Sequence, residues 1–312
     1  MNKIVSSKVS SPAQLLESLS DAIAYVAEKV AASVVRVGSG RRFGGSGVVW
    51  SSDGYIVTAS HVVGRLSEVE VGLSDGRSFH AKVLGHDQYS DVALLKIDAD
   101  KITPIELGDS ERVRAGQFVL ALANPFGEQP SVTSGIITSP KRTIRGWWGR
   151  LMENVVVTDA PLNPGYSGGP LVDAAGRMIG LNVAYVYSRG IAIPISTVKN
   201  VADRLAHEGK MKRAYIGIVS DTISLPEEIA KQPQIQQDEG LIVLSVASDT
   251  PAKRAGLAMG DVIVKFDQKP IMSVYDLHRL LTEEVIGKPT KLSLLRGEKL
   301  TELTITPNES SE

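Results

Sequence analysis

The sequence has no cysteine among its 312 residues. This absence excludes disulfide bonds, thiolate metal sites and a cysteine nucleophile. Charge of one sign is not in excess either, since 34 Lys and Arg residues face 35 Asp and Glu residues, for a net charge of −1. A balanced chain of this kind gives no electrostatic reason to expect a nucleic acid or an anionic membrane as its partner.

Long apolar runs are also lacking. The N-terminal stretch MNKIVSSKVSSPAQLLESLSDA contains no apolar segment long enough for a signal peptide or a membrane anchor. We therefore expect no integral membrane span and, from the sequence itself, a cytoplasmic location unless the chain is a processed or trimmed form. No phosphate-binding loop and no cluster of metal ligands occurs, so we expect neither a cofactor nor a metal.

What the sequence does contain is enough apolar material for real cores, because 43% of its residues are hydrophobic. Its length is typical of about two or three domains. The first segment, residues 1–32, is predicted to be helical from residue 14 to residue 31, with Pro12 near the start of the helix. Its apolar residues recur at intervals of three and four positions: Leu15, Leu16, Leu19, Ile23, Val26 and Val30.

Residues 33–209 have a different pattern. Short runs rich in β-branched residues, such as GYIVTAS, DVALLKI and NVVVTDA, alternate with Gly, Asp, Ser and Asn. Many short strands without alternating helices predict a mainly β domain, a sandwich or a barrel. A helix is predicted at residues 197–208, where Gly209 follows the last apolar position and is placed to end it.

Residues 215–307 form a third segment with both strands and a helix. Its predicted strands are GLIVLSV, DVIVKF and KLSLL. The helix VYDLHRLLTEE is opened by Ser273, and Asp276 stands three residues later in a capping-box pattern. We predict a small α+β domain that folds around its own core.

Ser167 is the candidate nucleophile, in the stretch NPGYSGGPLVD. Serines beside glycines are common in turns, so the assignment depends on a base and an acid elsewhere in the chain. Among the five histidines, His61 stands at the end of an apolar strand, which is a suitable place for a general base. Asp91, at the start of another apolar strand, is the candidate partner of that histidine, and Asp87 is a rival that has the setting of a turn residue.

The loop around Ser167 also offers an oxyanion hole. The backbone N–H groups of Gly165 and Ser167 can turn toward one point if glycine allows the required dihedral angles. The residue between them is Tyr166, which is bulky for a tight loop. We expect this tyrosine to tune the activity of the loop, and a chaperone or peptide-binding scaffold with weak or no proteolysis is the alternative that it raises.

Several motifs occur in an order that resembles the HtrA family of DegP-like serine proteases. They are TASHVV, SDVALLKI, NPFG, VTSGIIT, TDAPLNPGYSGGPLVD, GLNVA and IAIPIS. The part that contains YIGI, GLIVLSVASDTPAKRAGLAMGDVIVKFD and SVYDLHRLL resembles the PDZ domain that follows the protease in this family. The resemblance runs from about Ala22 to Pro307. One departure is Tyr166, where the family usually has Asn.

This resemblance implies a chymotrypsin-like fold of two six-stranded β-barrels followed by one PDZ domain. It implies His61 as general base, Asp91 as its partner and Ser167 as nucleophile, with oxyanion N–H groups from Gly165 and Ser167. It also implies an ATP-independent endopeptidase of protein quality control that acts on unfolded polypeptides, a homotrimer or larger assembly, and an extracytoplasmic location if the chain is processed.

Two binding surfaces complete the expectations. The strand GLNVA carries the predicted specificity residues Leu181, Val183 and Ala184, which are apolar and favour cleavage after small or medium aliphatic residues. The YIGI stretch resembles the carboxylate-binding loop of PDZ domains, with amides that can hold a peptide C-terminus. Its four residues are Tyr215, Ile216, Gly217 and Ile218.

Two further features have open roles. Lys212 and Arg213, just before the YIGI stretch, either add positive charge to that loop or only keep a linker soluble. Trp147 and Trp148 either pack under their own loop or form a regulatory, subunit-contact or weak membrane-contact loop. The stretch GSGRRFGG is too short to suggest a loop that reaches another subunit.

Overall fold

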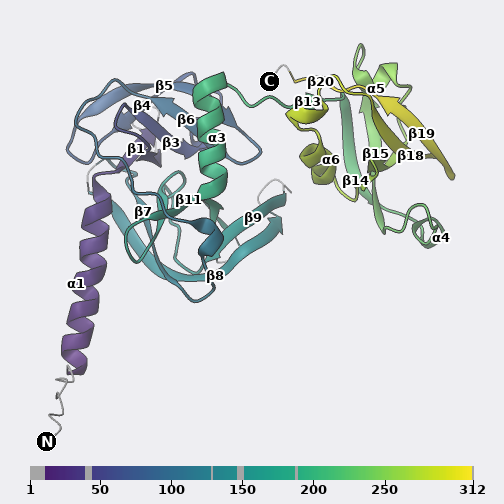
Figure 1. Cartoon of the computed structure of the whole chain (residues 1–312). Helices are drawn as coiled ribbons and strands as arrows, with labels where there is room; N and C mark the ends of the chain where they lie inside the picture. Colours follow the sequence, from purple (N-terminus) through teal and green to yellow (C-terminus); the bar gives the residue numbers. More distant parts are fainter. Residues whose placement is uncertain (1–10, 39–43, 128, 146–150, 187–188, 311–312) are drawn as a thin grey trace, which may run out of the picture. The chain divides into compact units, whose positions relative to one another are not determined.

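The computed structural model of the chain describes residues 11–38, 44–127, 129–145, 151–186 and 189–310. It divides into two compact units, Met1–Met211 and Lys212–Glu312 (Figure 1). Each unit has its own hydrophobic core.

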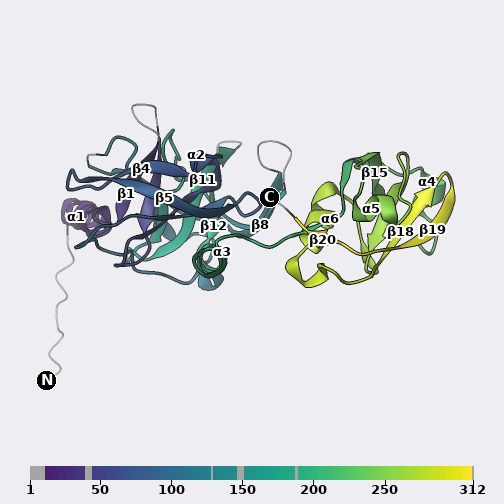
Figure 2. The same cartoon turned by 90° about the horizontal axis from the view of Figure 1, so that it is seen from above.

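The first unit contains two closed antiparallel barrels of six strands each (Figures 1 and 2). The strand order in the first barrel is β1-β2-β3-β6-β5-β4 and in the second β10-β11-β12-β9-β8-β7. Closure leaves neither sheet with an unpaired edge. The first barrel consists of β1 (Val34–Gly38), β2 (Gly45–Val49), β3 (Tyr55–Ala59), β4 (Glu68–Gly72), β5 (Ser78–Asp87) and β6 (Val92–Lys96). The second consists of β7 (Phe118–Ala123), β8 (Ser131–Arg145), β9 (Leu151–Thr158), β10 (Pro170–Asp173), β11 (Met178–Val186) and β12 (Arg189–Pro194).

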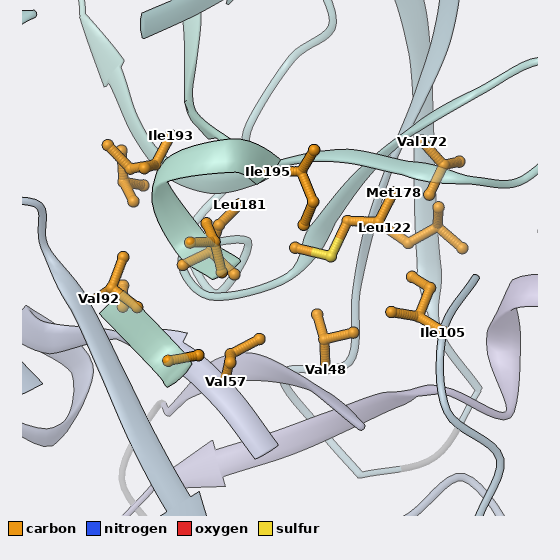
Figure 3. Close-up of a cluster of buried hydrophobic side chains, with 14 of the residues drawn as sticks. Val48, Val57, Val92, Ile105, Leu122, Val172, Met178, Leu181, Ile193 and Ile195 are labelled. Atoms are coloured by element: carbon orange, nitrogen blue, oxygen red, sulfur yellow. The ribbon is translucent and has the colours of Figure 1, made fainter. Parts of the chain in front are cut away.

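A shared core joins the two barrels. Val48 and Val57 of the first barrel belong to the same buried cluster as Leu122 and Leu181 of the second (Figure 3). Most of these side chains are Val, Ile and Leu, which favour strands because branched side chains pack well on a pleated surface. The barrels therefore form one packed body, and their facing ends can present a common site.

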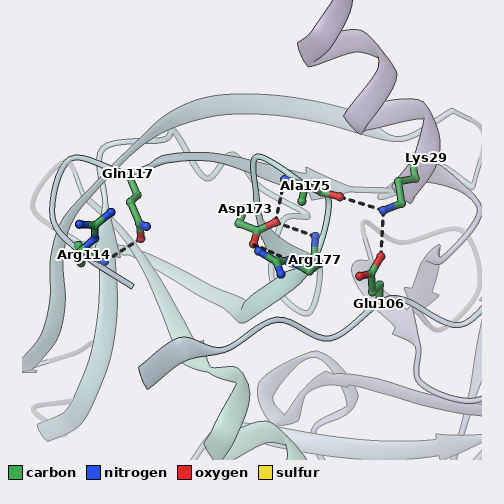
Figure 4. Close-up of polar contacts among 7 residues, drawn as sticks. All are labelled: Lys29, Glu106, Arg114, Gln117, Asp173, Ala175 and Arg177. Atoms are coloured by element: carbon green, nitrogen blue, oxygen red, sulfur yellow. Dashed lines mark hydrogen bonds and ion pairs between the residues drawn. The ribbon is translucent and has the colours of Figure 1, made fainter. Parts of the chain in front are cut away.

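Helix α1 (Pro12–Ala31) confirms the helix predicted from the N-terminal spacing. Ser11 caps it in a capping box with Gln14, and Pro12 occupies its first turn. Only its C-terminal part packs on the barrels, where Val26 and Val30 are buried. The Nζ of Lys29 lies 3.0 Å from Glu106 Oε2 and donates to the carbonyl of Ala175 at 2.9 Å. Figure 4 shows these two contacts as dashed lines.

The turn that accepts Lys29 is itself fixed by Asp173 at the end of β10. Its carboxylate accepts hydrogen bonds from the N–H groups of Ala175 and Arg177 and pairs with the Arg177 guanidinium at 2.7 Å (Figure 4). Lys29, in the last turn of helix α1, thus joins this helix to the second barrel. The leucines near the N-terminus of the helix are exposed.

Helix α3 (Ile195–Glu208) covers β5, β6 and β11. The predicted apolar face is confirmed, since Val198, Val201, Ala202 and Leu205 are all buried. Gly209 ends the helix in the left-handed conformation, with φ +69°. Because α3 packs on both barrels, it adds a second link between them.

The second unit is an α+β domain, as the sequence predicts. Its main sheet has the strand order β14-β15-β16-β18-β19, with β17 paired to β16. The sheet strands are β14 (Ile218–Ser224), β15 (Glu239–Val246), β16 (Val262–Phe266), β17 (Lys269–Pro270), β18 (Thr290–Arg296) and β19 (Lys299–Ile305). A short separate pair is formed by β13 (Ala214–Tyr215) and β20 (Asn308–Glu309). The helices are α4 (Glu227–Ala230), α5 (Pro251–Arg254) and α6 (Val274–Leu280).

Helix α6 begins where the sequence places it. Ser273 accepts a hydrogen bond from the N–H of Asp276, and the Asp276 carboxylate accepts one from the Ser273 hydroxyl at 3.0 Å. The helix ends at Leu280, earlier than the pattern VYDLHRLLTEE suggests, and residues Glu283–Val285 form a separate 3-10 turn. Overall, the mainly β fold with two barrels and a small α+β domain is confirmed.

Candidate active site

His61 lies on the short helix α2 (Ser60–Val63), directly after β3. Its ring is fixed by Asp91, because His61 Nδ1 lies 2.7 Å from Asp91 Oδ2. The other carboxylate oxygen of Asp91 accepts the backbone N–H of His61 at 2.9 Å. A carboxylate can only accept, so Nδ1 carries the proton and Nε2 is left as the basic nitrogen.

The backbone around Asp91 is specialised for this contact. Asp91 has φ +57°, an uncommon left-handed conformation for a residue other than glycine. Its carbonyl accepts the N–H of Ser60 at 3.0 Å, which ties it to the start of α2. The Asp91 side chain is 17% exposed and that of His61 is 49% exposed. Asp91 is therefore largely shielded from solvent, whereas the ring of His61 is accessible from outside.

Asp87, the rival acid, has a different role. It is buried at the end of β5 and accepts hydrogen bonds from the N–H groups of Tyr89 and Ser90 and from the Ser90 hydroxyl. These contacts close the turn that leads to Asp91. The structure therefore pairs Asp91 with His61 and uses Asp87 to shape the turn before it.

Ser167 lies on the loop between β9 and β10. Gly165 has φ +93°, and a Cβ atom at this position would lie 2.4 Å from Pro125 Cβ, so both conformation and space require glycine. Within the loop the N–H of Tyr166 donates to the carbonyl of Asn163 at 3.0 Å. The N–H groups of Gly165 and Ser167 have no hydrogen-bond partner among the described residues, which leaves two free donors beside the Ser167 hydroxyl.

The Ser167 hydroxyl donates to the carbonyl of Val183 at 3.2 Å. Within the described ranges no hydrogen bond joins Ser167 to His61. His61 and Asp91 are thus in contact with each other, whereas the Ser167 hydroxyl contacts β11. In enzymes without substrate, catalytic hydrogen bonds are often long or misaligned and tighten only in the substrate complex.

Tyr166 points into the second barrel. Its side chain is 3% exposed and packs in an apolar cluster with Leu162, Leu171 and Ile179. Burial raises the pKa of its phenol, and a hydrogen bond with the Thr133 side chain opposes this shift. The ring thus belongs to the core of the second barrel. The loop accommodates this bulky residue because its side chain lies inside the barrel and not in the loop itself.

The predicted specificity residues lie on β11. Leu181 is fully buried in the shared core (Figure 3), and Val183 is buried beside it. The side chain of Ala184 falls outside the described part of the structure. At this strand the contact with the nucleophile is made by the backbone carbonyl of Val183.

Asn182, which sequence reasoning missed, joins β11 to the nucleophile loop. Its backbone N–H donates to the carbonyl of Gly169 at 2.8 Å, and its carbonyl accepts the N–H of Gly168 at 2.7 Å. Its side-chain amide donates to the carbonyl of Pro170 at 2.9 Å. The available signal was one amide inside the otherwise apolar run GLNVA, since a buried amide needs partners.

In the second unit, the YIGI stretch forms a loop before the edge strand β14. The carbonyl of Ile216 accepts the N–H of Ala252 at 2.8 Å, and that of Gly217 accepts the N–H of Ala247 at 3.0 Å. In the described part of the chain the N–H groups of Ile216 and Gly217 make no hydrogen bond. Tyr215 is exposed, and Ile218 begins β14. The loop therefore has free amide donors next to an open strand edge, which is the arrangement that binds a peptide C-terminus as an added strand.

The charge before this loop is partly compensated. Lys212 lies 3.6 Å from Glu283. Arg213 forms a backbone bridge with Thr282. These two residues are thus part of the folded second unit, whereas Trp147 and Trp148, and residues 39–43 of the GSGRRFGG stretch, lie outside the described residues.

Among the residues that the structure describes, no group of three or more His, Asp and Glu side chains is placed to hold a metal ion. Over the same residues, none of the helices combines the length and the hydropathy that a membrane crossing requires.

Both units of the chain are similar to known domain families. Residues 45–181 match the trypsin-like peptidase domain and residues 215–306 the PDZ domain. The probable periplasmic serine endoprotease DegP-like of Halomonas elongata is 37% identical over 273 residues, 85% of this chain and 56% of that protein. The chain thus spans about half the length of such relatives.

Two other proteins are matched over more of their length. The putative serine protease HhoB of Synechocystis is 35% identical over 289 residues, 86% of this chain and 67% of that protein. The structure of the HtrA-type protease AlgW with a decapeptide superposes with a TM-score of 0.72 at 30% identity, over 92% of this chain and 99% of that one. With a peptidase domain and a PDZ domain in the same order, the chain belongs to the HtrA family of trypsin-like serine proteases, as its motifs suggest.

Proposed function

We propose that this protein is an ATP-independent serine endopeptidase that degrades unfolded or misfolded polypeptides. Residues 33–209 form its protease domain, and residues 215–307 form a PDZ domain whose binding of peptide C-termini regulates cleavage. The observation that carries the proposal is the combination of a fixed His61–Asp91 pair with two free amides beside Ser167. Each of these features serves acyl transfer, and no other class of reaction needs all of them.

The proposed chemistry is a two-step acyl transfer. Ser167 Oγ attacks the scissile carbonyl while His61 Nε2 takes its proton, and Asp91 stabilises the imidazolium that forms. The N–H groups of Gly165 and Ser167 bind the oxyanion. His61 then returns the proton to the leaving amine, the C–N bond breaks and an acyl-enzyme remains. Water activated by His61 releases the second product and restores Ser167.

Specificity is the part of the proposal that depends on β11. Val183 presents its carbonyl to Ser167, and Leu181, Val183 and Ala184 are apolar residues of the same strand. We expect cleavage after small or medium aliphatic residues such as Val and Ala. A peptide library read by mass spectrometry checks this, and a preference for Arg or Lys would exclude it.

The regulatory part depends on the YIGI loop. The free amides of Ile216 and Gly217 are placed to bind a terminal carboxylate, while the edge of β14 is available for the peptide backbone. We expect a peptide with a free C-terminal carboxylate to bind and to change the rate of casein cleavage. The same peptide with an amidated C-terminus is the matched control. We also expect the protein to form a homotrimer or a larger homo-oligomer. Light scattering measures the mass of the assembly.

A second candidate function is a chaperone or peptide-binding scaffold with weak proteolysis. The specific observation in its favour is that the Ser167 hydroxyl contacts Val183 and not His61. Degradation of casein across temperature, by wild type and by Ser167→Ala, separates the two. Cleavage by wild type alone supports the enzyme. If neither protein cleaves, even with the carboxylate peptide present, while both prevent aggregation of an unfolded protein, the scaffold function is favoured.

A further inference from the structure

Ser46, on β2 of the first barrel, contacts the nucleophile loop of the second barrel at two points. Its side-chain hydroxyl donates to the carbonyl of Gly165 at 2.7 Å. Its backbone N–H donates to the carbonyl of Ser167 at 2.8 Å. Ser46 is fully buried, so water does not compete for either contact.

The two residues that Ser46 holds are the same two whose N–H groups are free beside the nucleophile. Gly165 and Ser167 each donate an oxyanion amide in the proposed reaction, and each has its carbonyl bound to Ser46. Each bound carbonyl belongs to the planar peptide unit that follows its residue, so Ser46 holds the unit after Gly165 and the unit after Ser167. Only the φ and ψ angles of Gly165 and of Ser167 then stand between each held unit and the amide of the same residue. One residue of the first barrel therefore limits the orientation of both donors.

The remaining polar groups of Ser46 are also used. Its hydroxyl oxygen accepts the N–H of Asn124 at 2.8 Å, so the single hydroxyl proton is directed to Gly165. Its carbonyl accepts the hydroxyl of Thr58 at 2.6 Å. Thr58 lies on β3, the strand that leads into His61. Ser46 thus connects the strand of the base to the loop of the nucleophile.

The support matters because Gly165 is easily rotated. At φ +93° a glycine has many accessible conformations, and a loop that contains it can turn the amide away from the oxyanion site. Tyr166 anchors the loop from the second barrel, but its own N–H is bound to Asn163 and does not reach Gly165. The side chain of Ser46 is the group that binds the Gly165 carbonyl directly.

We infer that Ser46 is a positioning residue for the oxyanion hole, which it holds in its working geometry through the carbonyls of Gly165 and Ser167. The inference rests on the proposed function, since it assigns a role in acyl transfer. It predicts that removing the Ser46 hydroxyl weakens binding of the transition state more than binding of the substrate, because the oxyanion forms only during reaction.

The test is Ser46→Ala in the full chain, measured on a fluorogenic peptide with an aliphatic residue before the cleaved bond. We expect kcat to fall about 10- to 100-fold, with KM within about two-fold of wild type, because small errors in position cost rate rather than ground-state binding. A peptide aldehyde of the same sequence forms a tetrahedral adduct with Ser167. Its affinity should fall by about the same factor as kcat.

Ser110→Ala is the matched control, since Ser110 is also a buried serine of the first unit whose hydroxyl donates, at 3.1 Å, to Ser196. We expect kcat and the aldehyde affinity of this variant to stay within about two-fold of wild type. Thermal unfolding of both variants shows whether the loss of a buried hydroxyl alone affects the fold. If Ser46→Ala does not fold, Ser46→Cys takes its place, because a thiol is a weak donor of similar size and should give a smaller loss in the same direction.

The outcomes separate this inference from the proposed function. If wild type does not cleave the peptide and does not bind the aldehyde, the proposed function fails. If wild type does both, and a folded Ser46 variant equals it in kcat and aldehyde affinity, only the role of Ser46 is wrong. A higher KM with unchanged kcat in the Ser46 variant would also overturn that role. So would a fall in kcat that Ser110→Ala shows to the same extent.

Discussion

Among the described residues, the loop at Ser167 and the loop before β14 both present backbone amides that make no hydrogen bond, and the two loops are built alike. The loop at Ser167 offers the N–H groups of Gly165 and Ser167, and the loop before β14 offers those of Ile216 and Gly217. Each contains a glycine with positive φ, +93° at Gly165 and +87° at Gly217. Each is anchored by a buried side chain, Tyr166 in the second barrel and Ile216 in the core of the second unit.

The loops differ in what holds their carbonyls. The carbonyls of Ile216 and Gly217 are bound by backbone N–H groups of Ala252 and Ala247, from nearby segments of the same small domain. The carbonyl of Gly165 is bound by a side chain of another barrel, that of Ser46. A carboxylate ligand is fully charged when it binds, whereas an oxyanion develops only in the transition state. Binding of an oxyanion therefore depends more on fixed geometry than binding of a carboxylate does. Under the proposed function, this geometry comes from contacts between the two barrels.

The largest effect is expected from replacing Tyr166, the buried side chain that anchors the Ser167 loop in the second barrel. Tyr166→Asn should lower the free energy of unfolding by about 3–5 kcal/mol, because the variant loses a large ring from the core of the second barrel. We expect no gain in kcat, since the native ring already holds the loop. Urea unfolding and peptide kinetics measure the two effects. A rise in kcat by orders of magnitude would mean that the native loop is mostly misformed.

The next largest effect should come from Gly165→Ala. The Cβ atom of an alanine here would lie 2.4 Å from Pro125 Cβ, and the alanine would have to adopt φ +93°. The backbone and its amide must therefore move. Loss of one oxyanion donor costs about 10²- to 10³-fold in kcat. Steady-state kinetics measure this, with active sites counted by a covalent serine reagent. An unchanged kcat would show that the Gly165 amide is not a donor.

Gly217→Ala is the matching change in the PDZ loop. Its Cβ atom would lie 2.3 Å from Thr250 Cβ, at φ +87°. We expect the affinity for a carboxylate peptide to fall about ten-fold or more, by displacement of one charge-assisted hydrogen bond. Isothermal titration calorimetry measures the affinity, and the basal rate of peptide cleavage serves as the control. Equal affinities of wild type and variant would remove this loop from the proposed binding site.

The smallest expected effect concerns an ion pair in the second unit. Asp261 is buried, and burial by itself would raise the pKa of its carboxyl. Hydrogen bonds from the Arg296 guanidinium and from the N–H of Ala258 outweigh this effect and hold the pKa below its ordinary value. Since Arg296 is half exposed, Asp261→Asn should cost only about 1 kcal/mol of unfolding free energy at neutral pH.

The pH dependence of this change has a defined sign. A lowered pKa in the folded state means that the carboxylate contributes stability above its ordinary pKa of 3.8 and that this contribution is lost as pH falls through the lowered value. The difference in unfolding free energy between wild type and Asp261→Asn should therefore shrink from about pH 5 to about pH 2. A difference that stays constant over this range would exclude the ion pair as its cause.

Much of the architecture could be predicted from local patterns. The apolar spacing before Ala31, the short β-branched runs and Gly209 are local signals, and each led to the element that the structure contains. The end of α6 was less clear, because the apolar run continues past Leu280 while the backbone turns into a 3-10 segment. The triad and loop residues came from motifs, which name residue types but not the contacts between distant segments.

Sequence alone determined a mainly β domain of short strands, the helices at both of its ends and the need for glycine in the Ser167 loop, because dihedral preferences and side-chain periodicity act over a few residues. The two barrels and the candidate catalytic residues followed from the resemblance to a family. Tertiary structure alone decided where the ring of Tyr166 packs, which carbonyl the Ser167 hydroxyl contacts and that Ser46 binds the carbonyl of Gly165. Ser46 and Gly165 are 119 positions apart, and only the packing of one barrel on another brings them to 2.7 Å.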